Sequence, residues 1–318
     1  MVAVCDWMHG DPPVSGGPFV AAIGNFDGVH LGHKQLLEQA RLAAKAAGLP
    51  LAVLTFSPHP RAYFRPDDAP FLLQDRQAKT DALSAAGADQ VIYIAFDKAL
   101  QTCSAESFVH DVLQPLGIVQ LFAGADFAYG KGRSGDMSSL AKLGAQVGIS
   151  VTSVPLLQDE HAATISSSRV RAALQSGQVA LAAAMLGHDP VIAGTVQQGD
   201  QRGRLLQFPT ANLSLSSLLA PAFGVYAVEA QLGTPASGPR LQGVANIGIR
   251  PTVNDRGVLG EVHLFDFDRD IYGERLTVYL KAFIRAEKKF SGLEELQAQI
   301  AKDAHSARTL LPSSSLTA

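Results

Sequence analysis

The sequence predicts an α/β domain with a doubly wound parallel sheet, followed by an antiparallel β-barrel or sandwich with a C-terminal helix. The chain has 318 residues, which is long for one hydrophobic core and comfortable for two. In the first half, short apolar runs alternate with helical patterns, as in parallel sheets covered by helices. After about Gly187, strand-like runs follow one another with little helix between them. We therefore expect domains at residues 1–186 and 187–318.

Five buried strands are expected in the first half, each an apolar run between polar or glycine-rich breaks. They are Phe19–Gly24, Leu51–Phe56, Gln90–Phe96, Gln120–Gly124 and Ser150–Leu157. The segment His33–Ala47 has one apolar face and ends near Gly48, which predicts an amphipathic helix after the first strand. Val179–Leu186 is expected to be the last helix of this domain. Sheets of this type bind ligands beyond the carboxyl ends of their strands.

The second half contains the strands expected to form the barrel, and glycine and proline separate them. They are Val191–Gln198, Gly224–Gln231, Leu241–Ile247, Gly260–Phe267 and Glu274–Ile284. A final amphipathic helix is expected over Leu293–Ala307, and the tail Leu310–Ala318 is expected to be loose.

The composition of the chain bears on its binding partners and on its location in the cell. The chain is 47% hydrophobic with a net charge of −3, so it lacks a basic field for nucleic acid, and local groups must hold any phosphate. Cys5 and Cys103 show no metal-ligand spacing, which favours a reducing compartment. The start of the chain lacks a signal-peptide pattern, and no apolar run approaches the ~20 residues of a membrane span. We expect a cytoplasmic protein without membrane or nucleic-acid partners, either a monomer or a weak homo-oligomer.

The string Gly24-Asn25-Phe26-Asp27-Gly28-Val29-His30-Leu31-Gly32-His33 joins the first strand to the first helix. His30 and His33 are three apart and can point the same way, toward a helix N-terminus that suits phosphate. Two imidazoles there can donate hydrogen bonds to charge that develops on a transferring α-phosphate. The alternative is that the two histidines cap the helix or lie in a core. Because the pair is flanked by glycines at a strand-to-helix turn, we favour the catalytic role. Asn25 and Asp27 either order the loop or reach the nucleotide or a metal-bound water.

Three serines, Ser166, Ser167 and Ser168, open a later helix. They can cap that helix or donate to a triphosphate, and these readings are equally supported for any one of them. Arg169 and Arg171 favour ligand binding because guanidinium groups form charge-assisted bonds with phosphate.

The string GNFDGVHLGH resembles the adenylyltransferase module of bacterial bifunctional riboflavin kinase/FAD synthetases, and its histidine turn resembles the nucleotidylyltransferase superfamily. Segments Thr55–Pro60, Gly124–Gly130 and Ile165–Arg171 agree with that family, with conservative changes at Ser168 and Val170. The resemblance implies a nucleotidylyltransferase-like sheet and ATP binding by Gly24, Asn25, Phe26, Asp27, Gly28, His30, His33, Ser166, Ser167, Ser168 and Arg169. It implies flavin binding by His59, Asp126, Phe127 and Arg133. Without the resemblance, Asp126 is explained equally well as a turn residue.

A second polar string begins at Gly194 and runs through Gly199, Arg202, Gly203 and Arg204 to Phe208-Pro209-Thr210-Ala211-Asn212. A strand leads into a glycine- and arginine-containing loop that can fold over phosphates, although such loops alone are common hairpins. Thr210 and Asn212 are two apart, so in extended chain they face the same side. Their oxygens are hard ligands that suit Mg²⁺ beside nucleotide phosphates.

This half resembles riboflavin kinase, and the resemblance implies a riboflavin-kinase-like, antiparallel six-stranded β-barrel with a C-terminal helix. Further matching segments run from Gly224–Ala227 to Phe283–Phe290. The resemblance implies ATP binding by Gly194, Gly199, Arg202, Gly203, Arg204, Thr210 and Asn212. It implies flavin binding by Phe208, Asn246, Arg250 and Arg285. It also implies that Glu261 is the general base, whereas the residue alone suggests a solvated strand position. Gln207 stands where the family has glycine, and its side chain could crowd the nucleotide or strain the backbone.

The expected protein is therefore a bifunctional, ATP-binding transferase of FAD biosynthesis, both kinase and nucleotidyltransferase. It would phosphorylate riboflavin to FMN and then adenylylate FMN to FAD, releasing pyrophosphate, with Mg²⁺ as cofactor and ATP as co-substrate. Two alternatives remain. One is nucleotidyl transfer to another phosphorylated cofactor precursor. The other is a flavin-binding sensor that has lost turnover.

Overall fold

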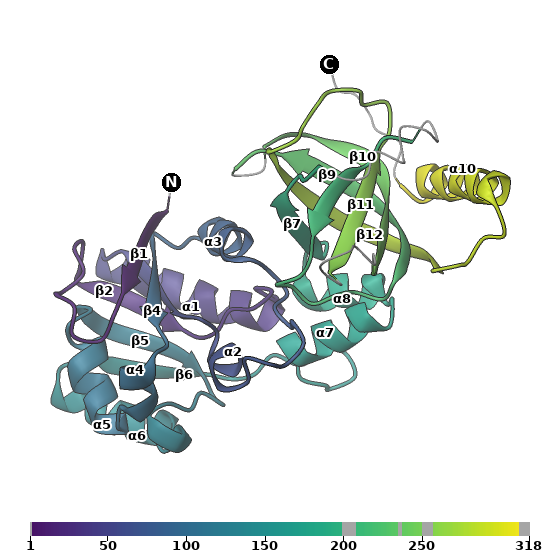
Figure 1. Cartoon of the computed structure of the whole chain (residues 1–318). Coiled ribbons are helices and arrows are strands. Elements are labelled where there is room, and N and C mark those ends of the chain that lie inside the picture. The colour runs from purple at the N-terminus through teal and green to yellow at the C-terminus, as the bar shows by residue number, and fades with distance from the viewer. Residues whose placement is uncertain (1, 199–207, 235–236, 250–256, 312–318) are drawn as a thin grey trace. The chain divides into compact units, whose positions relative to one another are not determined.

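The computed structural model describes residues 2–198, 208–234, 237–249 and 257–311 (Figure 1). The chain divides into two compact units, one formed by Met1–Asp68 with Arg76–Ile165 and the other by Ala69–Asp75 with Ser166–Ala318. The second unit therefore begins before the expected boundary at residue 187. The reason is that helices α7 (Ser167–Gln175) and α8 (Val179–Leu186) pack with the barrel. Val179 lies in the barrel core, and Ala222 donates its N–H to the carbonyl of Leu174.

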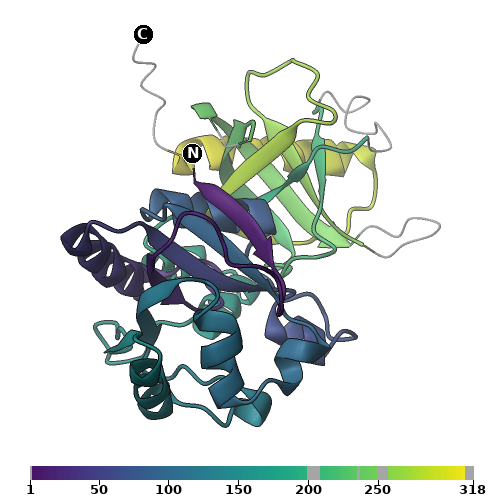
Figure 2. The same ribbon diagram turned by 90° about the vertical axis from the view of Figure 1, so that its left-hand side faces the viewer.

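The first unit contains a six-stranded sheet in which all neighbouring strands are parallel, in the order β1-β4-β3-β2-β5-β6 (Figures 1 and 2). The strands are β1 (Ala3–Trp7), β2 (Phe19–Ile23), β3 (Leu51–Ser57), β4 (Gln90–Ala95), β5 (Ile118–Gly124) and β6 (Ser150–Val154). The last five agree with the sequence prediction. Strand β1 was missed because it is a short edge strand, mostly exposed and interrupted by Asp6, so it has no apolar run.

Helices cover both faces of this sheet, which confirms the doubly wound prediction. The side chains of β2 alternate between two cores: Ile23 packs in one, and Val20 packs with α1 in the other. The helical segments of the unit are α1 (Leu31–Ala47), α2 (Pro60–Phe64), α3 (Arg76–Ala85), α4 (Lys98–Thr102), α5 (Ala105–Ser107), the π-helical η1 (Phe108–Leu113), the 3-10 turn η2 (Lys131–Arg133) and α6 (Met137–Gln146).

The second unit contains a six-stranded antiparallel sheet in the order β7-β12-β9-β10-β11-β8. Its elements are β7 (Val191–Thr195), β8 (Ala211–Ser214), β9 (Gly224–Leu232), β10 (Ser237–Ile249), β11 (Val258–Leu264), β12 (Arg275–Ala286) and helix α10 (Leu293–Leu310). A bridge between Gln197 and Asn212 links the chain after β7 to β8, so the sheet nearly closes into the predicted barrel. Its sixth strand, β8, comes from the segment expected only to be extended.

Successive side chains along the barrel strands alternate between the interior of the barrel and its outer face. Tyr226 and Ala245 point into the barrel core, whereas their neighbours Val225 and Val244 pack outside it. That outer cluster contains Ala307 of α10. Helix α10 therefore lies against the outside of β9 and β10.

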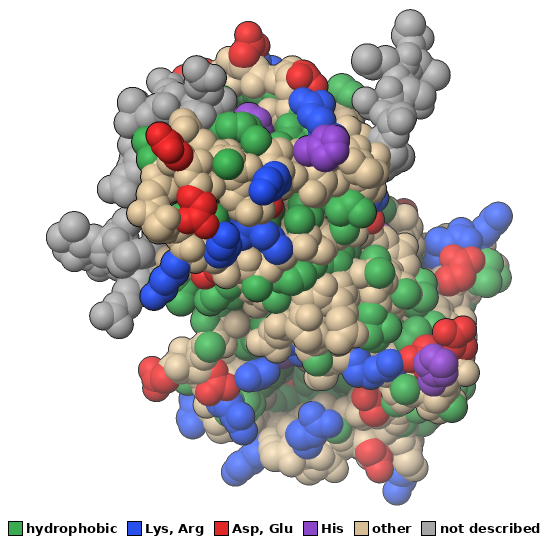
Figure 3. All heavy atoms as spheres, turned by 90° about the vertical axis from the view of Figure 1, so that its right-hand side faces the viewer, with side chains coloured by type: hydrophobic (Ala, Val, Ile, Leu, Met, Phe, Trp, Pro, Cys, Tyr) green, Lys and Arg blue, Asp and Glu red, His purple; other side chains and the backbone are tan. Residues whose placement is uncertain are grey.

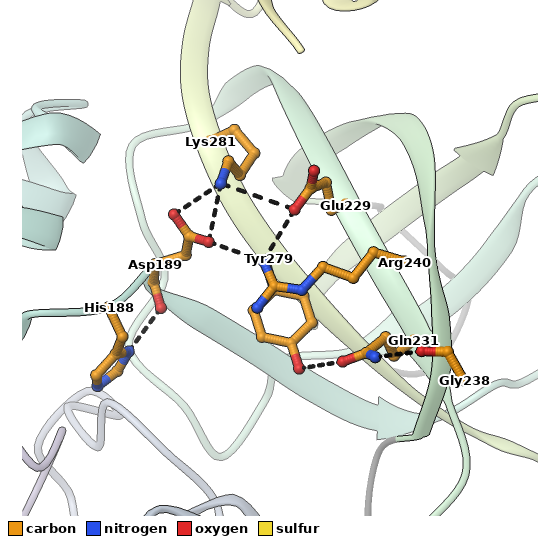
Figure 4. A network of polar contacts seen from close by, with 8 residues as sticks. All are labelled: His188, Asp189, Glu229, Gln231, Gly238, Arg240, Tyr279 and Lys281. Atoms are coloured by element: carbon orange, nitrogen blue, oxygen red, sulfur yellow. Dashed lines mark hydrogen bonds and ion pairs between the residues drawn. The ribbon is translucent and has the colours of Figure 1, made fainter. Parts of the chain in front are cut away.

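A polar network on another part of the barrel holds the segment that follows α8 (Figure 4). Lys281 donates to both oxygens of Asp189, at 3.0 and 2.9 Å. Arg240 bridges Asp189 and Glu229, at 3.1 and 2.9 Å, and its guanidinium lies 3.9 Å from the ring centre of Tyr279. These contacts fix the chain just before β7.

The molecular surface agrees with the small net charge. On the face drawn in Figure 3, basic and acidic side chains lie interspersed among hydrophobic and other groups. None of the helices in the described part of the chain has the length and hydropathy that a bilayer crossing needs.

Candidate active sites

The candidate residues of the first unit meet at the carboxyl edge of its sheet. Strand β2 lies between β3 and β5, and the chain builds β3 and β4 on one side before it builds β5 and β6 on the other. Ligands of open α/β sheets bind where the strand order reverses in this way. The histidine turn follows β2, His59 follows β3, and Asp126 follows β5. Neighbouring parallel strands thus bring these segments to one edge.

The turn after β2 has a backbone that its sequence alone disfavours. Phe26, Gly28 and Val29 have φ angles of 47°, 85° and 41°. A positive φ suits glycine, but it strains a bulky residue such as Phe26 and a β-branched one such as Val29. Both side chains are fully buried in the core beneath α1. Burial of these two anchors offsets the strain and fixes the path of the turn.

His30 and His33 form a stacked pair at the start of α1. Their ring centres are 3.6 Å apart with an interplanar angle of 16°. His30 is the N-cap, and its Nδ1 accepts the backbone N–H of His33 at 3.3 Å. In a neutral imidazole with an accepting Nδ1, the proton is on Nε2. The first turn of α1 carries no acidic residue, so no carboxylate competes there with a phosphate.

His33 has the electrostatic signature of a functional residue. Burial, followed by the neighbouring His30 and Lys79, lowers the pKa of His33 well below its usual 6.5. Its Nδ1 is buried and has no hydrogen-bond partner among the described residues. Buried polar atoms are nearly always paired in folded proteins. A neutral His33 with an unpaired ring nitrogen is therefore suited to contact a ligand.

Two groups behind the turn were missed by sequence reasoning. Lys79 of α3 donates to the backbone carbonyl of Asn25 at 3.0 Å. Thr55 of β3 donates to the same carbonyl at 3.2 Å. Thr55 stood in a segment with family resemblance, but Lys79 lies 54 residues from Asn25 in a helix with no motif. Only the tertiary fold brings it to the site.

The residues expected to bind flavin in the first unit are less enclosed. His59 caps α2, with Nδ1 accepting the N–H of Arg61 at 3.0 Å. Asp126 is exposed, and Phe127 is half-buried and stacks on Tyr129 with ring centres 5.9 Å apart. Arg133 is exposed in η2. These contacts leave their flavin role a prediction.

The serine–arginine segment opens α7, in the second unit. Ser166 is the N-cap of α7 and accepts the N–H of Arg169 at 3.4 Å, so capping is one of its roles. Ser167 and Ser168 follow in the first turn. Arg171 donates through Nε to the carbonyl of Phe71 at 2.8 Å, and its guanidinium lies over the Phe71 ring. Arg171 therefore anchors Ala69–Asp75 to α7.

The barrel brings four of the expected kinase residues into one row. Glu261 of β11 pairs directly with Asn212 of β8 on one side and with Asn246 of β10 on the other. Asn246 pairs with Val225 of β9, which pairs with Arg285 of β12. Directly paired residues project from the same face of a sheet. Because Val225 packs against α10, this row lies on the outer face of the barrel.

Asn212 provides the strongest sign of a ligand site in this row. Its side chain is buried, and its Oδ1 has no hydrogen-bond partner within the described ranges. Thr210 lies two residues earlier and is half-buried. An unpaired amide oxygen beside a hydroxyl is an oxygen donor set that fits Mg²⁺. Among the described residues no group of three His, Cys, Asp or Glu side chains could hold a metal by itself.

His263, which sequence analysis did not select, organises the approach to Asn212. It lies two residues after Glu261 on β11, and its Nδ1 is 2.8 Å from the carbonyl of Pro209, to which it donates. Its ring also packs edge-on against Phe208, with ring centres 5.2 Å apart. His263 thus holds the segment that leads into Thr210 and Asn212.

Arg285 is part of an ion pair with α10. Its Nε and Nη2 donate to the carboxylate of Asp303, with the shortest distance 2.6 Å, and its Nη1 donates to the carbonyl of Ala286. Asp303 is only 5% exposed. These bonds clamp α10 to β12, so the expected flavin contact of Arg285 has to coexist with them. Gly194 lies in β7, while Gly199, Arg202, Gly203, Arg204, Gln207 and Arg250 lie outside the described residues.

The two sites define a two-domain enzyme of nucleotide chemistry. A family model described as FAD synthetase matches residues 15–169, and one described as riboflavin kinase matches residues 186–311. A bifunctional riboflavin kinase/FMN adenylyltransferase of Escherichia coli K12 is 42% identical over 290 residues, 91% of each chain. A relative of the same name from Bacillus subtilis is 37% identical, again over 91% of both chains. The chain belongs to the bifunctional riboflavin kinase/FMN adenylyltransferase family.

A solved structure has the same architecture over almost the whole chain. It is a protein from Streptococcus pneumoniae named macrolide-efflux protein, with 28% identity and a TM-score of 0.81. The alignment covers 95% of this chain and 98% of that one. That name disagrees with the curated relatives. The relatives carry the assignment because their identity is higher and both family models match this chain.

Proposed function

We propose that the histidine turn of the first unit transfers an adenylyl group from ATP to FMN, and that the Asn212–Glu261 row of the barrel phosphorylates riboflavin. One observation carries this assignment. Of four buried polar side-chain atoms without a partner in the described part of the chain, two are His33 Nδ1 and Asn212 Oδ1, one in each candidate site. Unpaired buried polar atoms at both motifs favour ligand-binding sites over purely structural positions.

In the adenylyl-transfer step, a phosphate oxygen of FMN attacks the α-phosphorus of ATP. The new P–O bond forms as the bond to pyrophosphate breaks, so no covalent enzyme intermediate is needed. Negative charge builds up on the α-phosphate oxygens, close to the N-terminus of α1. The imidazole N–H groups of His30 and His33 would donate hydrogen bonds to that charge. Their stacking and the anchored turn provide orientation before the substrate arrives.

In the kinase step, the 5′-hydroxyl of riboflavin attacks the γ-phosphorus of a second ATP. Glu261 would accept the hydroxyl proton while ADP leaves. Its register partners Asn212 and Asn246 flank it in the row, which would orient the nucleotide on one side and riboflavin on the other. Thr210 and Asn212 would hold Mg²⁺, which when bound neutralises phosphate charge.

The remaining assignments are proposals of the same kind. Residues 1–186 and 187–318 would serve the adenylyltransferase and the kinase, and Ser166–Arg169 would contribute phosphate contacts. His59, Asp126, Phe127 and Arg133 would contact FMN, and Phe208, Asn246, Arg250 and Arg285 would contact riboflavin. Two free cysteines support a reducing, cytoplasmic setting.

A chromatographic product assay tests the assignment of the two sites. Purified protein would receive riboflavin, ATP and Mg²⁺, and separately FMN, ATP and Mg²⁺. Glu261→Gln should stop at riboflavin yet make FAD from supplied FMN, and His30→Ala should accumulate FMN. Loss of both FMN formation from riboflavin and FAD formation from supplied FMN in either variant, with the fold intact by circular dichroism, would contradict two separate sites. Retention of FMN synthesis by Glu261→Gln would exclude Glu261 as the base.

A further inference from the structure

A buried lysine stands directly behind the histidine turn. Lys79 of α3 is 5% exposed, and among the described residues it is the only buried lysine. Burial strongly disfavours the charged form of an ammonium group unless a partner compensates. Its pKa is lowered by burial, while the carboxylate of Asp27 opposes that shift. Because burial of a cation is unfavourable, we expect Lys79 to have a function beside the histidine turn that an apolar side chain would not perform.

The contact that Lys79 makes points to this role. Its Nζ donates at 3.0 Å to the carbonyl of Asn25, the residue that precedes the strained part of the turn. Thr55, which is fully buried, donates to the same carbonyl at 3.2 Å. Two donors from two different elements therefore hold one backbone oxygen. Phe26, the first residue with positive φ, follows Asn25 immediately.

Lys79 also acts on the imidazole that faces the ligand. The charged groups that shift the pKa of His33 are His30 and Lys79, and both lower it in addition to burial. Asp27, itself buried, is the charged group that acts on Lys79. Lys79 thus interacts with an acidic residue of the turn and with a candidate catalytic histidine, and it donates a hydrogen bond to the backbone of Asn25, two residues before Asp27.

We propose that Lys79 is a positioning residue of the adenylyl-transfer site, which fixes the Asn25–His30 turn through the Asn25 carbonyl before nucleotide binds. The inference rests on the proposed role of His30 and His33. A turn held in this way presents both rings in one orientation, and a neutral His33 can adjust its proton to the phosphate that arrives. Lys79 itself need not touch the substrate.

Three substitutions at this position separate its hydrogen bond from its charge. Lys79→Met removes both and should lower kcat/KM for FAD formation from FMN by about 30-fold or more, since misplaced catalytic groups lose rate steeply. Lys79→Gln keeps a donor without the charge and should recover most of that loss. Lys79→Arg keeps both and should approach the parent enzyme. Lys45→Met, which removes an exposed lysine from the last turn of α1, is the matched control and should leave turnover unchanged.

The second readout is the titration of His33, followed by NMR of its ring protons in the ligand-free protein. Its pKa should rise in Lys79→Met and Lys79→Gln alike, because a cation that disfavours protonation is gone. The pKa of His33 should remain unchanged in Lys79→Arg and Lys45→Met. A purely structural lysine would affect stability without this pattern. Riboflavin phosphorylation in the same samples reports whether the second unit remains intact.

The outcomes are distinguishable. Parent-like kcat/KM in Lys79→Met, or an unshifted His33 titration in folded Lys79→Gln, would overturn the role of Lys79. If Lys79→Met does not fold, the titration and turnover of Lys79→Gln decide. Retained adenylyl transfer in His30→Ala and His33→Ala would instead refute the proposed function, whatever the lysine variants show.

Discussion

The two candidate sites are built in opposite ways. In the first unit, one unbroken string of residues leaves β2, turns and begins α1, so the stacked histidines come from positions three apart in one segment. In the barrel, Asn212, Glu261, Asn246 and Arg285 come from four strands and meet only through pairing register. The first site depends on local backbone geometry, and the second depends on the order and register of a whole sheet.

This difference has a mechanical consequence. A change in the turn should disturb one reaction and little else, because its anchors are buried beneath α1. A change that shifts a barrel strand or α10 should alter several members of the row together, since a register slip moves every side chain of a strand. Substitutions can therefore test whether the two sites respond differently.

The largest effect is expected from His33→Asn. Asparagine keeps a polar group but loses the ring that stacks on His30 and the buried ring nitrogen that has no partner among the described residues. FAD formation from FMN should fall by about 10²–10³-fold, the usual consequence of losing a donor to transition-state charge. Riboflavin phosphorylation, measured on the same sample, should remain within twofold. A comparable loss of both activities would mean that the turn also affects the site of riboflavin phosphorylation.

The next largest effect is expected from Asp303→Asn, which keeps the shape of the side chain but removes its charge. Arg285 is 23% exposed and Asp303 is 6% exposed at the side chain, so the pair is mostly shielded from water. Its loss should destabilise the second unit by about 2–3 kcal/mol, less than a fully buried pair would cost. Chemical denaturation measures this. The KM for riboflavin should rise in parallel, because β12 and α10 bound the row, whereas FAD synthesis from FMN should be unaffected.

Asn212→Leu should separate activity from stability. Leucine is close in size and removes an amide oxygen that is buried without a partner in the described structure. Riboflavin phosphorylation should fall about 30-fold as a polar ligand contact is lost. The melting temperature without nucleotide should stay equal or rise by about 2–4 °C, since an unsatisfied group has gone. A clear fall in melting temperature would show that Asn212 is structural rather than reserved for a ligand.

Sequence reasoning was more complete for the turn than for the barrel, and the reason is physical. The histidine string and the strand before it carry their pattern in consecutive residues, so both were predicted at nearly the observed bounds. The barrel row depends on which strands pair and in what register, and period-two patterns alone do not encode that. Asn212 was named as an oxygen ligand and Glu261 through resemblance, and their direct pairing emerged only from the fold.

What the sequence could not predict is the support behind each site. Lys79 and His263 have no local motif, because each acts on a backbone carbonyl contributed by a distant segment. Strand β1 was missed because an exposed edge strand lacks an apolar run. The clamp between Arg285 and Asp303 joins a strand to a helix 18 residues away, and only the packing of α10 shows that it forms.

A smaller effect should appear when pH is lowered. Burial depresses the pKa of His33 in the folded chain, so below about 6.5 the unfolded chain takes up a proton that the folded chain does not. Stability contributed by neutral His33 is therefore present above this pH and is lost as pH falls below it, by at most about 1.4 kcal/mol per pH unit. Denaturation of the first unit at pH 7.5 and 5.5 measures the slope. His33→Asn should flatten it, and an unchanged slope would assign the proton uptake to another group.

The smallest effect is expected from Lys281→Met, which shares β12 with Arg285 but lies in the network around Asp189. Lys281 is 25% exposed, and Arg240 would still bond both Asp189 and Glu229 after its removal. The loss of stability should therefore stay below about 1 kcal/mol, as for most partly exposed ion pairs. Both activities should remain at parental values, in contrast to Arg285→Met on the same strand. Equal losses of activity from Lys281→Met and Arg285→Met would show that riboflavin phosphorylation depends on the stability of the whole barrel. The row of Asn212 and Glu261 would then have no special role in that reaction.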